Sequence, residues 1–414
     1  MKELDTSTAN KVAVIGGGAA GFFSAINCKE SHPQNEVVIF EKSDKILSKV
    51  KVSGGGRCNV TNHTIEIRKL ITNYPRGSKT LKKLFPHFNT KDTLQWFESR
   101  GVSLKSEKDG RIFPVSNSSA SIIKCFVEKC EKLGITIKTS CAIKKVTPTQ
   151  EGVLLERENE TLHYDAVIIT TGGGPKLSSY DWLSDLELEL IPPVPSLFTF
   201  NLPSEKTAEL MGLVAPATQV KIQGTKFTSE GPILFTHWGF SGPAILKLSA
   251  FAARSLSEQD YQFKILINWL NAPTEDAVRH SLMDFFQQHR KKKISNANPF
   301  ETINSRLWHY LLDRAAIPGD TNVGEISKKQ INKLVNTLFV DLYEVQGKTT
   351  FKEEFVTCGG IALNNLNLPQ MSLKSNPRIY FAGEILDIDG ITGGFNFQAA
   401  WTTGFLAAQL QSSS

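Results

Sequence analysis

Residues 11–21 read Lys11-Val-Ala-Val-Ile-Gly-Gly-Gly-Ala-Ala-Gly21, an apolar run that leads into a glycine-rich turn. A segment of helical character follows at 22–29, and a second apolar run, Val37 to Phe40, ends at Glu41. The order strand, turn, helix, strand is the context in which G-x-G-x-x-G binds a dinucleotide. Gly16 permits the tight turn, Gly18 lets a pyrophosphate approach the backbone, and Gly21 lets the helix pack closely on the strand.

The helix after this turn is expected to present its first N–H groups, at Ala19 and Ala20, to the phosphates of the dinucleotide. Glu41 lies twenty residues beyond Gly21, where a carboxylate binds a ribose hydroxyl, and the neighbouring Lys42 belongs to the expected site. An acidic residue at this position disfavours a 2′-phosphate, so FAD or NAD is expected here in preference to NADP.

A second glycine-rich loop favours FAD over NAD. It reads Ser53-Gly-Gly-Gly-Arg-Cys-Asn-Val-Thr-Asn62. A simple NAD-dependent dehydrogenase has little use for such a loop, whereas an extended FAD needs further backbone donors along its pyrophosphate and ribityl chain. Arg57 can offset phosphate charge. The expected FAD contacts in this loop are Ser53, Gly54, Gly55, Arg57, Cys58 and Asn59.

Two further segments read as buried strands that end in glycine turns. They are Asp165 to Gly174 and Arg378 to Glu384. The turn at 387–396 then opens a helix predicted over 399–410, and its N–H groups can meet the pyrimidine edge of a flavin. The remaining expected FAD contacts are Val146, Thr171, Gly172, Gly383, Glu384, Asp387, Gly393, Gly394, Phe395 and Asn396. Two roles are open for Asp387 and Asp389, capping this last helix or holding a ribityl hydroxyl.

Other oxidoreductase and metal classes lack their signatures. The six cysteines form no CxxC pair, so neither a zinc site nor a thioredoxin-type motif is expected. Cys125 and Cys130 have the spacing of a flavin-linked disulfide but lie in a predicted helix at 119–133, where buried packing is expected. No second G-x-G-x-x-G is present, so a nicotinamide donor, NAD(P)H, would have to dock transiently, or O₂ is the oxidant. No metal ligand set is predicted.

The sequence predicts where the chain is found, and its charge distribution is uneven. The polar N-terminus and the absence of an apolar run of about 18–20 residues predict a cytoplasmic chain with no membrane contact. Between Lys42 and Lys145 there are 22 Lys and Arg against 8 Asp and Glu, a surplus of 14, although the whole chain carries only +6. A second cluster is Arg290-Lys-Lys-Lys293. Solvated helix faces and a polyanion-binding surface are both consistent with this pattern.

Together these motifs resemble the YhiN-like family of bacterial FAD-binding flavoproteins, also called aminoacetone-oxidase-like and including the BaiN-related proteins. The resemblance spans nearly the whole chain. It rests on the loop 53–62, Arg111-Ile-Phe-Pro114 with Ser116, Phe235-Thr-His-Trp-Gly-Phe-Ser-Gly-Pro243, and the segments 383–390 and 392–396. The chain departs from the family at 47–51, where Gly-Arg-Lys is more usual, and at Cys358, where Ala is usual.

The resemblance implies an α/β fold in which an FAD-binding Rossmann-like domain is interrupted by an insert. The domain would comprise residues 1–195 and 349–414, and the insert residues 196–348. Within the insert, a β-barrel is expected around 196–270 and 317–348, and a helical bundle at about 273–316.

The resemblance also implies an FAD-dependent oxidoreductase, and three functions stay open. One is a reductase of a uracil C=C bond in ribosomal RNA that forms dihydrouridine. The second is a small-molecule enzyme, either an amine oxidase or an enone reductase of the bile-acid type. The third is a non-catalytic RNA-binding protein stabilised by flavin. The catalytic residues are not identified. His237, a possible acid or base, Cys58 and Arg111 are weak candidates, and His237 can equally be a hydrogen-bonded barrel residue. Arg111 could instead line the face of the flavin. The oligomeric state is not predicted.

Overall fold

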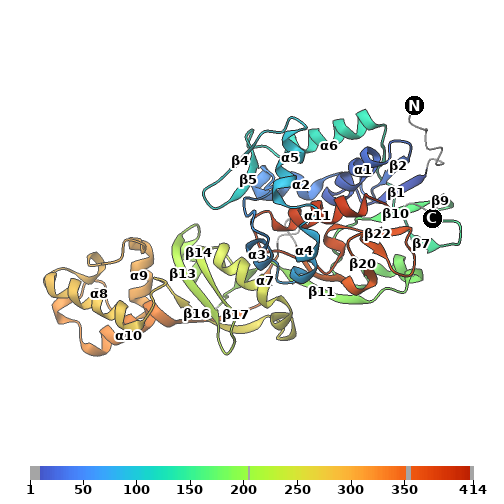
Figure 1. Cartoon of the computed structure of the whole chain (residues 1–414). Helices are drawn as coiled ribbons and strands as arrows, with labels where there is room; N and C mark the ends of the chain where they lie inside the picture. The colour runs from blue at the N-terminus through green and yellow to red at the C-terminus, as the bar shows by residue number, and fades with distance from the viewer. Residues whose placement is uncertain (1–9, 204–205, 351–355, 411–414) are drawn as a thin grey trace. The chain divides into compact units, whose positions relative to one another are not determined.

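The computed structural model describes residues 10–203, 206–350 and 356–410. The chain divides into two compact units, Met1–Pro195 with Lys352–Ser414, and Ser196–Phe351 (Figure 1). The expected insert with bounds 196–348 stays a prediction.

The first unit is built on a seven-stranded sheet in the order β20-β21-β22-β10-β1-β2-β6. Its central strands are parallel, and Val12 pairs with Val37 on one side and with Ala166 on the other. The pairing of β22 with β10 joins strands from the two ends of the chain in one sheet. The bounds are β1 (Lys11–Ile15), β2 (Glu36–Phe40), β6 (Thr136–Lys138), β10 (Ala166–Ile169), β20 (Leu366–Asn367), β21 (Ser372–Leu373) and β22 (Ile379–Phe381).

Three helices of this unit share an aromatic core. They are α1 (Ala19–Ser31), α6 (Ala120–Leu133) and α11 (Phe395–Ala407). The ring of Phe23 on α1 lies 5.1 Å from that of Trp401 on α11, and Phe126 on α6 lies 5.8 Å from Trp401. Helix α11 begins at Phe395, four residues before the predicted start, because Gly394 in the left-handed conformation (φ 90°) ends the turn and directly precedes the helix.

Shorter elements surround this core. Two small sheets have the orders β3-β5-β4 and β7-β8-β9, and β11 pairs with β19. Their bounds are β3 (Thr61–Asn62), β4 (Leu104–Ser106), β5 (Arg111–Pro114), β7 (Lys145–Pro148), β8 (Val153–Arg157), β9 (Glu160–Tyr164), β11 (Leu190–Ser196) and β19 (Val356–Ile361). The short helices are α2 (Ser48–Gly56), α3 (Ile67–Leu70), η1 (Ile71–Asn73), α4 (Ser78–Leu84), α5 (Thr90–Glu98), η2 (Leu177–Leu186), η6 (Leu363–Asn365) and η7 (Gly383–Ile385).

The second unit has its own seven-stranded sheet, in the order β17-β16-β13-β14-β15-β12-β18. Adjacent strands are antiparallel, and alternate residues of β17 are buried. The bounds are β12 (Thr199–Asn201), β13 (Val214–Ile222), β14 (Thr228–Phe235), β15 (Gly239–Ser241), β16 (Gln262–Asn268), β17 (Asp341–Gln346) and β18 (Lys348–Thr349). A closed barrel stays a prediction.

The second unit has helices outside the range 273–316 for which a helical bundle was predicted. They are α7 (Pro243–Glu258), α8 (Glu275–Gln288), α9 (Ser305–Arg314) and α10 (Lys328–Val340), with η3 (Lys206–Leu210), η4 (Ile294–Asn296) and η5 (Val323–Glu325). The prediction assigned 317–348 to the barrel, but 328–340 is helical. The physical reason is a capping box at Ser327 and Gln330, together with apolar residues at helical spacing that are buried, Leu334 and Leu338 among them.

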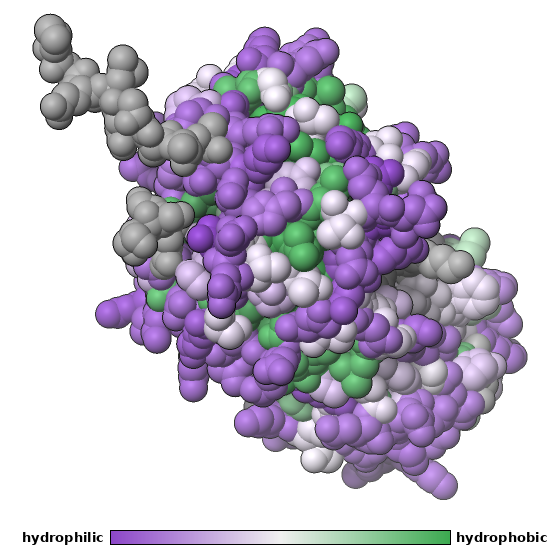
Figure 2. All heavy atoms as spheres, turned by 90° about the vertical axis from the view of Figure 1, so that its right-hand side faces the viewer, coloured by the Kyte–Doolittle hydropathy of each residue, from purple (hydrophilic) through white to green (hydrophobic). Residues whose placement is uncertain are grey.

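The surface and the cysteines add three observations. Among the described residues, no helix is long and apolar enough to cross a membrane. The face shown in Figure 2 is mostly hydrophilic, with apolar side chains showing through in small groups. All six cysteines are free and buried, Cys125 and Cys130 on α6 included.

Candidate functional site

The first glycine turn lies where the carboxyl ends of β1 and β10 meet. Gly16 has φ 115°, and a Cβ there would lie 2.6 Å from the carbonyl oxygen of Thr170 at the end of β10. A Cβ on Gly21 would lie 1.9 Å from the carbonyl oxygen of Gly16. Both positions therefore require glycine, because any side chain would force α1 away from the sheet.

The same turn leaves space in front of Gly18. A Cβ on Gly18 would have no heavy atom within 4 Å. The first hydrogen bond of α1 runs from the N–H of Phe22 to the carbonyl of Gly18, so the N–H groups of Ala19, Ala20 and Gly21 precede it. This is the arrangement in which a helix N-terminus can bind a phosphate.

Glu41 stands at the carboxyl end of β2, next to this turn. Its Oε2 accepts a hydrogen bond of 2.8 Å from the N–H of Gly17, and its Oε1 accepts bonds from the N–H and the hydroxyl of Ser43. The carboxylate is half-buried, and Lys42 beside it is exposed. Glu41 is thereby fixed against the glycine turn.

The second glycine loop forms the end of α2, where the helix breaks. Ser53 is extended, and Gly54 and Gly55 are left-handed, with φ 58° and 68°. A Cβ on Gly54 would lie 2.9 Å from the ring of Phe113, whereas one on Gly55 would meet no heavy atom within 4 Å. One side of this loop is thus packed on β5, and the other is open.

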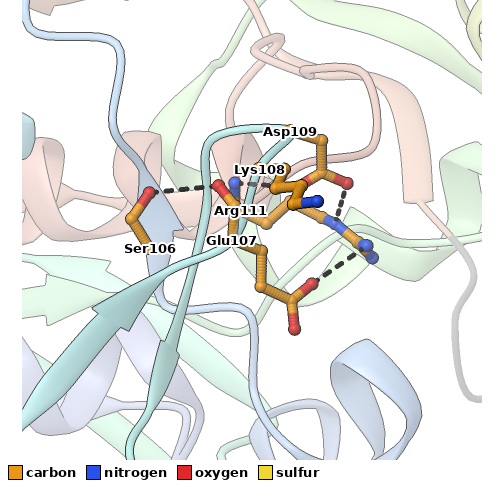
Figure 3. A pocket seen from close by; sticks show the side chains of 5 residues that line it. All are labelled: Ser106, Glu107, Lys108, Asp109 and Arg111. Atoms are coloured by element: carbon orange, nitrogen blue, oxygen red, sulfur yellow. Dashed lines mark hydrogen bonds and ion pairs between the residues drawn. The ribbon is translucent and has the colours of Figure 1, made fainter.

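The sequence suggested that Arg57 offsets the charge of a phosphate, but in the structure its guanidinium is already paired. Its Nη1 is 2.6 Å from Oε1 of Glu107, and its guanidinium lies 3.9 Å from the centre of the Phe113 ring. Glu107 also bonds Arg111, which in turn pairs with Asp109 on the β4–β5 turn. Figure 3 shows Glu107, Asp109 and Arg111 at a pocket on that turn, with dashed lines from Arg111 to both carboxylates. The contact of Arg57 and Arg111 with a flavin stays a prediction.

Cys58 and Asn59, which follow Arg57, point inward. Burial raises the pKa of the Cys58 thiol to about 12, and the side chain is fully buried. The amide of Asn59, oriented to satisfy its neighbours, donates to the carbonyls of Ile112 and Thr61 and accepts from the N–H of Gly394. Asn59 therefore ties this loop to the turn before α11.

The turn after β10 offers another open glycine. Gly172 has φ 78°, and a Cβ there would meet no heavy atom within 4 Å, while Thr171 is exposed. Gly173 is different, because its Cβ would lie 2.2 Å from Oγ1 of Thr357. Val146 lies on β7 and is buried.

Glu384 lies in η7, just after the carboxyl end of β22. Its Oε1 accepts a hydrogen bond of 2.9 Å from the N–H of Thr357, and its Oε2 lies 2.6 Å from Nζ of Lys49. The preceding Gly383 has φ 81°, and a Cβ there would lie 2.8 Å from that of Ala20. The carboxylate is thus close to the helix N-terminus, the β10 turn and α2.

Lys49 and Thr357 of this cluster were not predicted from the sequence. Lys49 lies in the stretch 47–51 that departs from the family pattern, and this departure is the one sequence feature that could have indicated it. The hydroxyl of Thr357 is buried beside Gly173 and, within the described residues, has no hydrogen-bond partner. A buried hydroxyl of this kind fits a polar group of a ligand.

The turn before α11 packs against the second glycine loop. Gly393 and Gly394 have φ 126° and 90°, and a Cβ on Gly394 would lie 2.5 Å from the backbone of Thr61. The side chain of Asn396 accepts from the N–H of Gly390 and donates to its carbonyl. Phe395 is buried.

Asp389 does not cap α11. The helix has no side-chain cap, and the fully buried carboxylate of Asp389 instead forms an ion pair with Arg76, whose Nε is 2.5 Å from Oδ1. The N–H of Asp387 donates to the carbonyl of Ile361. Arg76 therefore belongs to the core and not to a free basic surface.

Arg76 is one of several contacts that join α3, η1 and α4 to the loop 387–396. The N–H of Ile391 donates to the carbonyl of Asn73, and the hydroxyl of Tyr74 donates to the carbonyl of Phe395. A Cβ on Gly77 would lie 2.6 Å from the side chain of Ile388. We call residues 65–91 the basic module; its exposed cations are Arg68, Lys69, Lys79, Lys82, Lys83 and Lys91.

His237 belongs to the second unit. It lies with Trp238 in a turn that Thr236 closes by hydrogen bonds to Gly239, and both rings are exposed, with their centres 5.0 Å apart. The interpretation as a hydrogen-bonded barrel histidine is therefore wrong, because the side chain points into solvent. Its role as an acid stays a prediction.

The residues of the first unit fit FAD. The open glycines Gly18 and Gly172, the N-terminus of α1, the Glu41 carboxylate and the hydroxyl of Thr357, which has no partner within the described residues, lie at the carboxyl ends of the parallel strands, where α/β folds bind dinucleotides. Ribose binding by Glu41 stays a prediction. Among the described residues, no group of three His, Cys, Asp or Glu could hold a metal ion.

Comparison with known proteins identifies the family. The family model described as HI0933-like protein Rossmann domain matches residues 10–410. A ribosomal RNA dihydrouridine synthase of Escherichia coli strain K12 is 28% identical over 412 residues, covering 96% of both chains. A 3-dehydro-bile acid delta(4,6)-reductase of Clostridium scindens is 26% identical over 411 residues, covering 97% of this chain and 98% of that protein.

A likeness to solved structures was also found. The open conformation of a flavocytochrome c3 fumarate reductase has a TM-score of 0.49 and 14% identity, covering 98% of this chain and 78% of that chain.

Proposed function

Because the chain belongs to the HI0933-like family of FAD-dependent oxidoreductases, we propose that it reduces the C=C bond of a uracil base in ribosomal RNA to give dihydrouridine. The observation that carries this proposal is the attachment of the basic module to the loop 387–396. That loop leads into α11 and is expected to contact the flavin, so a polyanion bound by the module is held near the cofactor.

The contacts of the basic module support this placement. Arg76 and Asp389 form a buried ion pair, and Tyr74 bonds the backbone of Phe395. Because Arg76 pairs with Asp389, the exposed cations of the module are those of α3 and α4 and Lys91 at the start of α5. Among them only Lys69 has an ion-pair partner within the described residues, Glu66 at 3.0 Å. Phosphate contacts by such side chains make binding strong at low salt and weak at high salt.

Bound FAD, once reduced, supplies a hydride to the activated C=C bond. The chain has to unstack the base, hold it against the cofactor and supply one proton to the neighbouring carbon. Cys58 is a poor acid for this step, since burial raises its pKa to about 12. NAD(P)H, docking transiently, is the proposed source of the reducing equivalents.

The test is a map of dihydrouridine in large-subunit ribosomal RNA from a deletion strain and from wild type, read by mass spectrometry. We expect one dihydrouridine to be missing and to be restored by the cloned gene. A K79E/K82E/K83E variant should fail to restore it, whereas K108E, on the β4–β5 turn outside the module, should succeed. An unchanged map in the deletion strain contradicts the proposal.

A small-molecule substrate is the second candidate, because the bile acid reductase is about as similar to the chain as the RNA enzyme is. In that case the exposed cations serve solubility only. Slow reoxidation of the reduced flavin by O₂ with turnover of an enone indicates a reductase, and rapid reoxidation with peroxide release and turnover of an amine indicates an oxidase. A flavin that no donor reduces, in a protein that still binds RNA, indicates a non-catalytic role.

A further inference from the structure

The second unit carries a separate basic surface, far along the chain from the basic module. It consists of Arg290, Lys291, Lys292 and Lys293, between α8 and η4, and we call it the basic ribbon. All four side chains are exposed, and none of them has an ion-pair partner among the residues that the structure describes. Four adjacent cations repel one another, so an arrangement of this kind favours a polyanionic ligand.

The backbone of the ribbon is held in place on one side. The N–H of Gly324 donates to the carbonyl of Arg290, the N–H of Val323 donates to that of Lys292, and the N–H of Ile294 donates to that of Thr321. Lys293 also forms an antiparallel bridge with Asn322. Because residues 319–324 fix the ribbon, its cations project from a rigid backbone, which lowers the entropy lost when a ligand binds.

The ribbon keeps a net positive charge in its surroundings. Two acidic residues lie in or next to the facing segment, Asp320 and Glu325, and Glu325 accepts a hydrogen bond of 2.9 Å from Asn322. His289, which directly precedes the ribbon, stacks on Phe285 with ring centres 4.0 Å apart, and its Nδ1 lies 2.9 Å from the carbonyl oxygen of Phe285. Four cations against two carboxylates leave the site suited to phosphate groups.

We propose that the basic ribbon is a second RNA contact, which binds phosphate groups of the same RNA whose uracil base is reduced. This inference rests on the proposed function and makes it more specific. The substrate is then a folded RNA long enough to engage both units at once, and not a nucleotide or a short oligonucleotide. Two linked contacts raise the affinity for the long RNA well above that of either contact alone.

The test measures binding of the FAD-loaded full chain to deproteinised large-subunit ribosomal RNA and to a short oligouridylate over a range of salt. K291E/K292E is the test variant. The matched control is K221E/K226E, which changes the charge equally on exposed lysines of the same unit. Flavin absorbance and circular dichroism report whether each variant is folded.

For K291E/K292E we expect the slope of log K against log salt with ribosomal RNA to become shallower by about 1.4–1.8, since each lost phosphate contact removes about 0.7–0.9. Binding of the oligouridylate should not change, and K221E/K226E should behave as wild type with both ligands. Equal losses in the two variants, or no loss in K291E/K292E, overturn the inference.

The outcomes separate the two proposals. If wild type binds ribosomal RNA, K79E/K82E/K83E weakens it and K291E/K292E does not, only the ribbon inference fails. If wild type binds no RNA at all, the proposed function and the inference both fail.

Discussion

Replacing Asp389 by asparagine tests whether Arg76 has a structural role that differs from the role of the exposed cations of the basic module. The carboxylate of Asp389 is fully buried and Arg76 is 12% exposed. The Asp389→Asn substitution would leave the guanidinium of Arg76 largely buried without its counter-charge. The variant should therefore loosen the attachment of α3 and α4 to the loop 387–396.

The size of the effect follows from the burial of the pair. Breaking a buried ion pair by removing one partner costs about 3–5 kcal/mol. In a unit of this size, 1 kcal/mol lowers the melting temperature by about 2–4 °C, so D389N should melt about 6–20 °C below wild type. The double variant R76L/D389L removes both charges and should lose less stability than D389N, because no unpaired charge stays buried.

The melting temperature is measured by thermal unfolding followed by flavin fluorescence. Binding of ribosomal RNA to the intact protein is measured alongside. The matched control is D109N, whose partner Arg111 is 40% exposed and whose own side chain is 54% exposed, so it should cost no more than about 1 kcal/mol. K82E should keep the wild-type melting temperature and lose RNA affinity. The reasoning is refuted if D389N melts within 1 °C of D109N, or if D389N is less harmful than R76L/D389L.

Three further variants or treatments test the site. G21A should purify without FAD, as judged by flavin absorbance, because its Cβ would lie 1.9 Å from the Gly16 carbonyl oxygen; a yellow G21A protein contradicts the close packing of α1. E384A should weaken FAD more than K49M, since Glu384 also anchors the N–H of Thr357, while the pair with the 48% exposed Lys49 is worth at most about 1 kcal/mol; titration of apoprotein with FAD gives both affinities. Cys28, Cys58 and Cys130, with pKa values near 12, should stay unreactive to a thiol reagent at pH 8 in the native protein and react in denaturant. Because folding raises these pKa values above the ordinary 9, stability should fall as the pH rises from about 9 towards 12, and a flat stability profile over this window contradicts their burial.

The sheet and its glycine turns could be predicted because local sequence dictates them. A parallel strand buried on both faces must be continuously apolar, and the turn after it can be made only by residues that accept a positive φ or a close backbone contact. Gly16 and Gly21 meet these requirements in the structure, and their spacing alone is informative. The start of α11 was missed because helical periodicity does not show that Gly394 ends the turn.

The partners of charged side chains could not be predicted, since they lie far apart in the sequence. Arg76 and Asp389 are 313 residues apart, and Arg57 and Glu107 are 50 apart. Composition therefore counted Arg76 and Arg57 as free cations, whereas folding buries one of them against a carboxylate and pairs the other. Lys49 was missed for the same reason, because its partner Glu384 is 335 residues away.

The difference between cations that pair within the fold and cations that stay exposed bears on how the substrate is selected. Two relatives of nearly equal similarity, one named for ribosomal RNA and one for a bile acid, share the scaffold, so the residues that build the sheet and its turns do not choose between them. A small amphipathic molecule has no use for cations on both units, whereas an RNA phosphate backbone does. If RNA is the substrate, we expect its selection to depend on exposed lysines that have no ion-pair partner among the described residues, such as Lys79, Lys82 and Lys83 of the basic module and Lys291, Lys292 and Lys293 of the basic ribbon. Charge-neutral substitution of those lysines should therefore abolish RNA binding while leaving the reduction of the flavin by its donor unchanged.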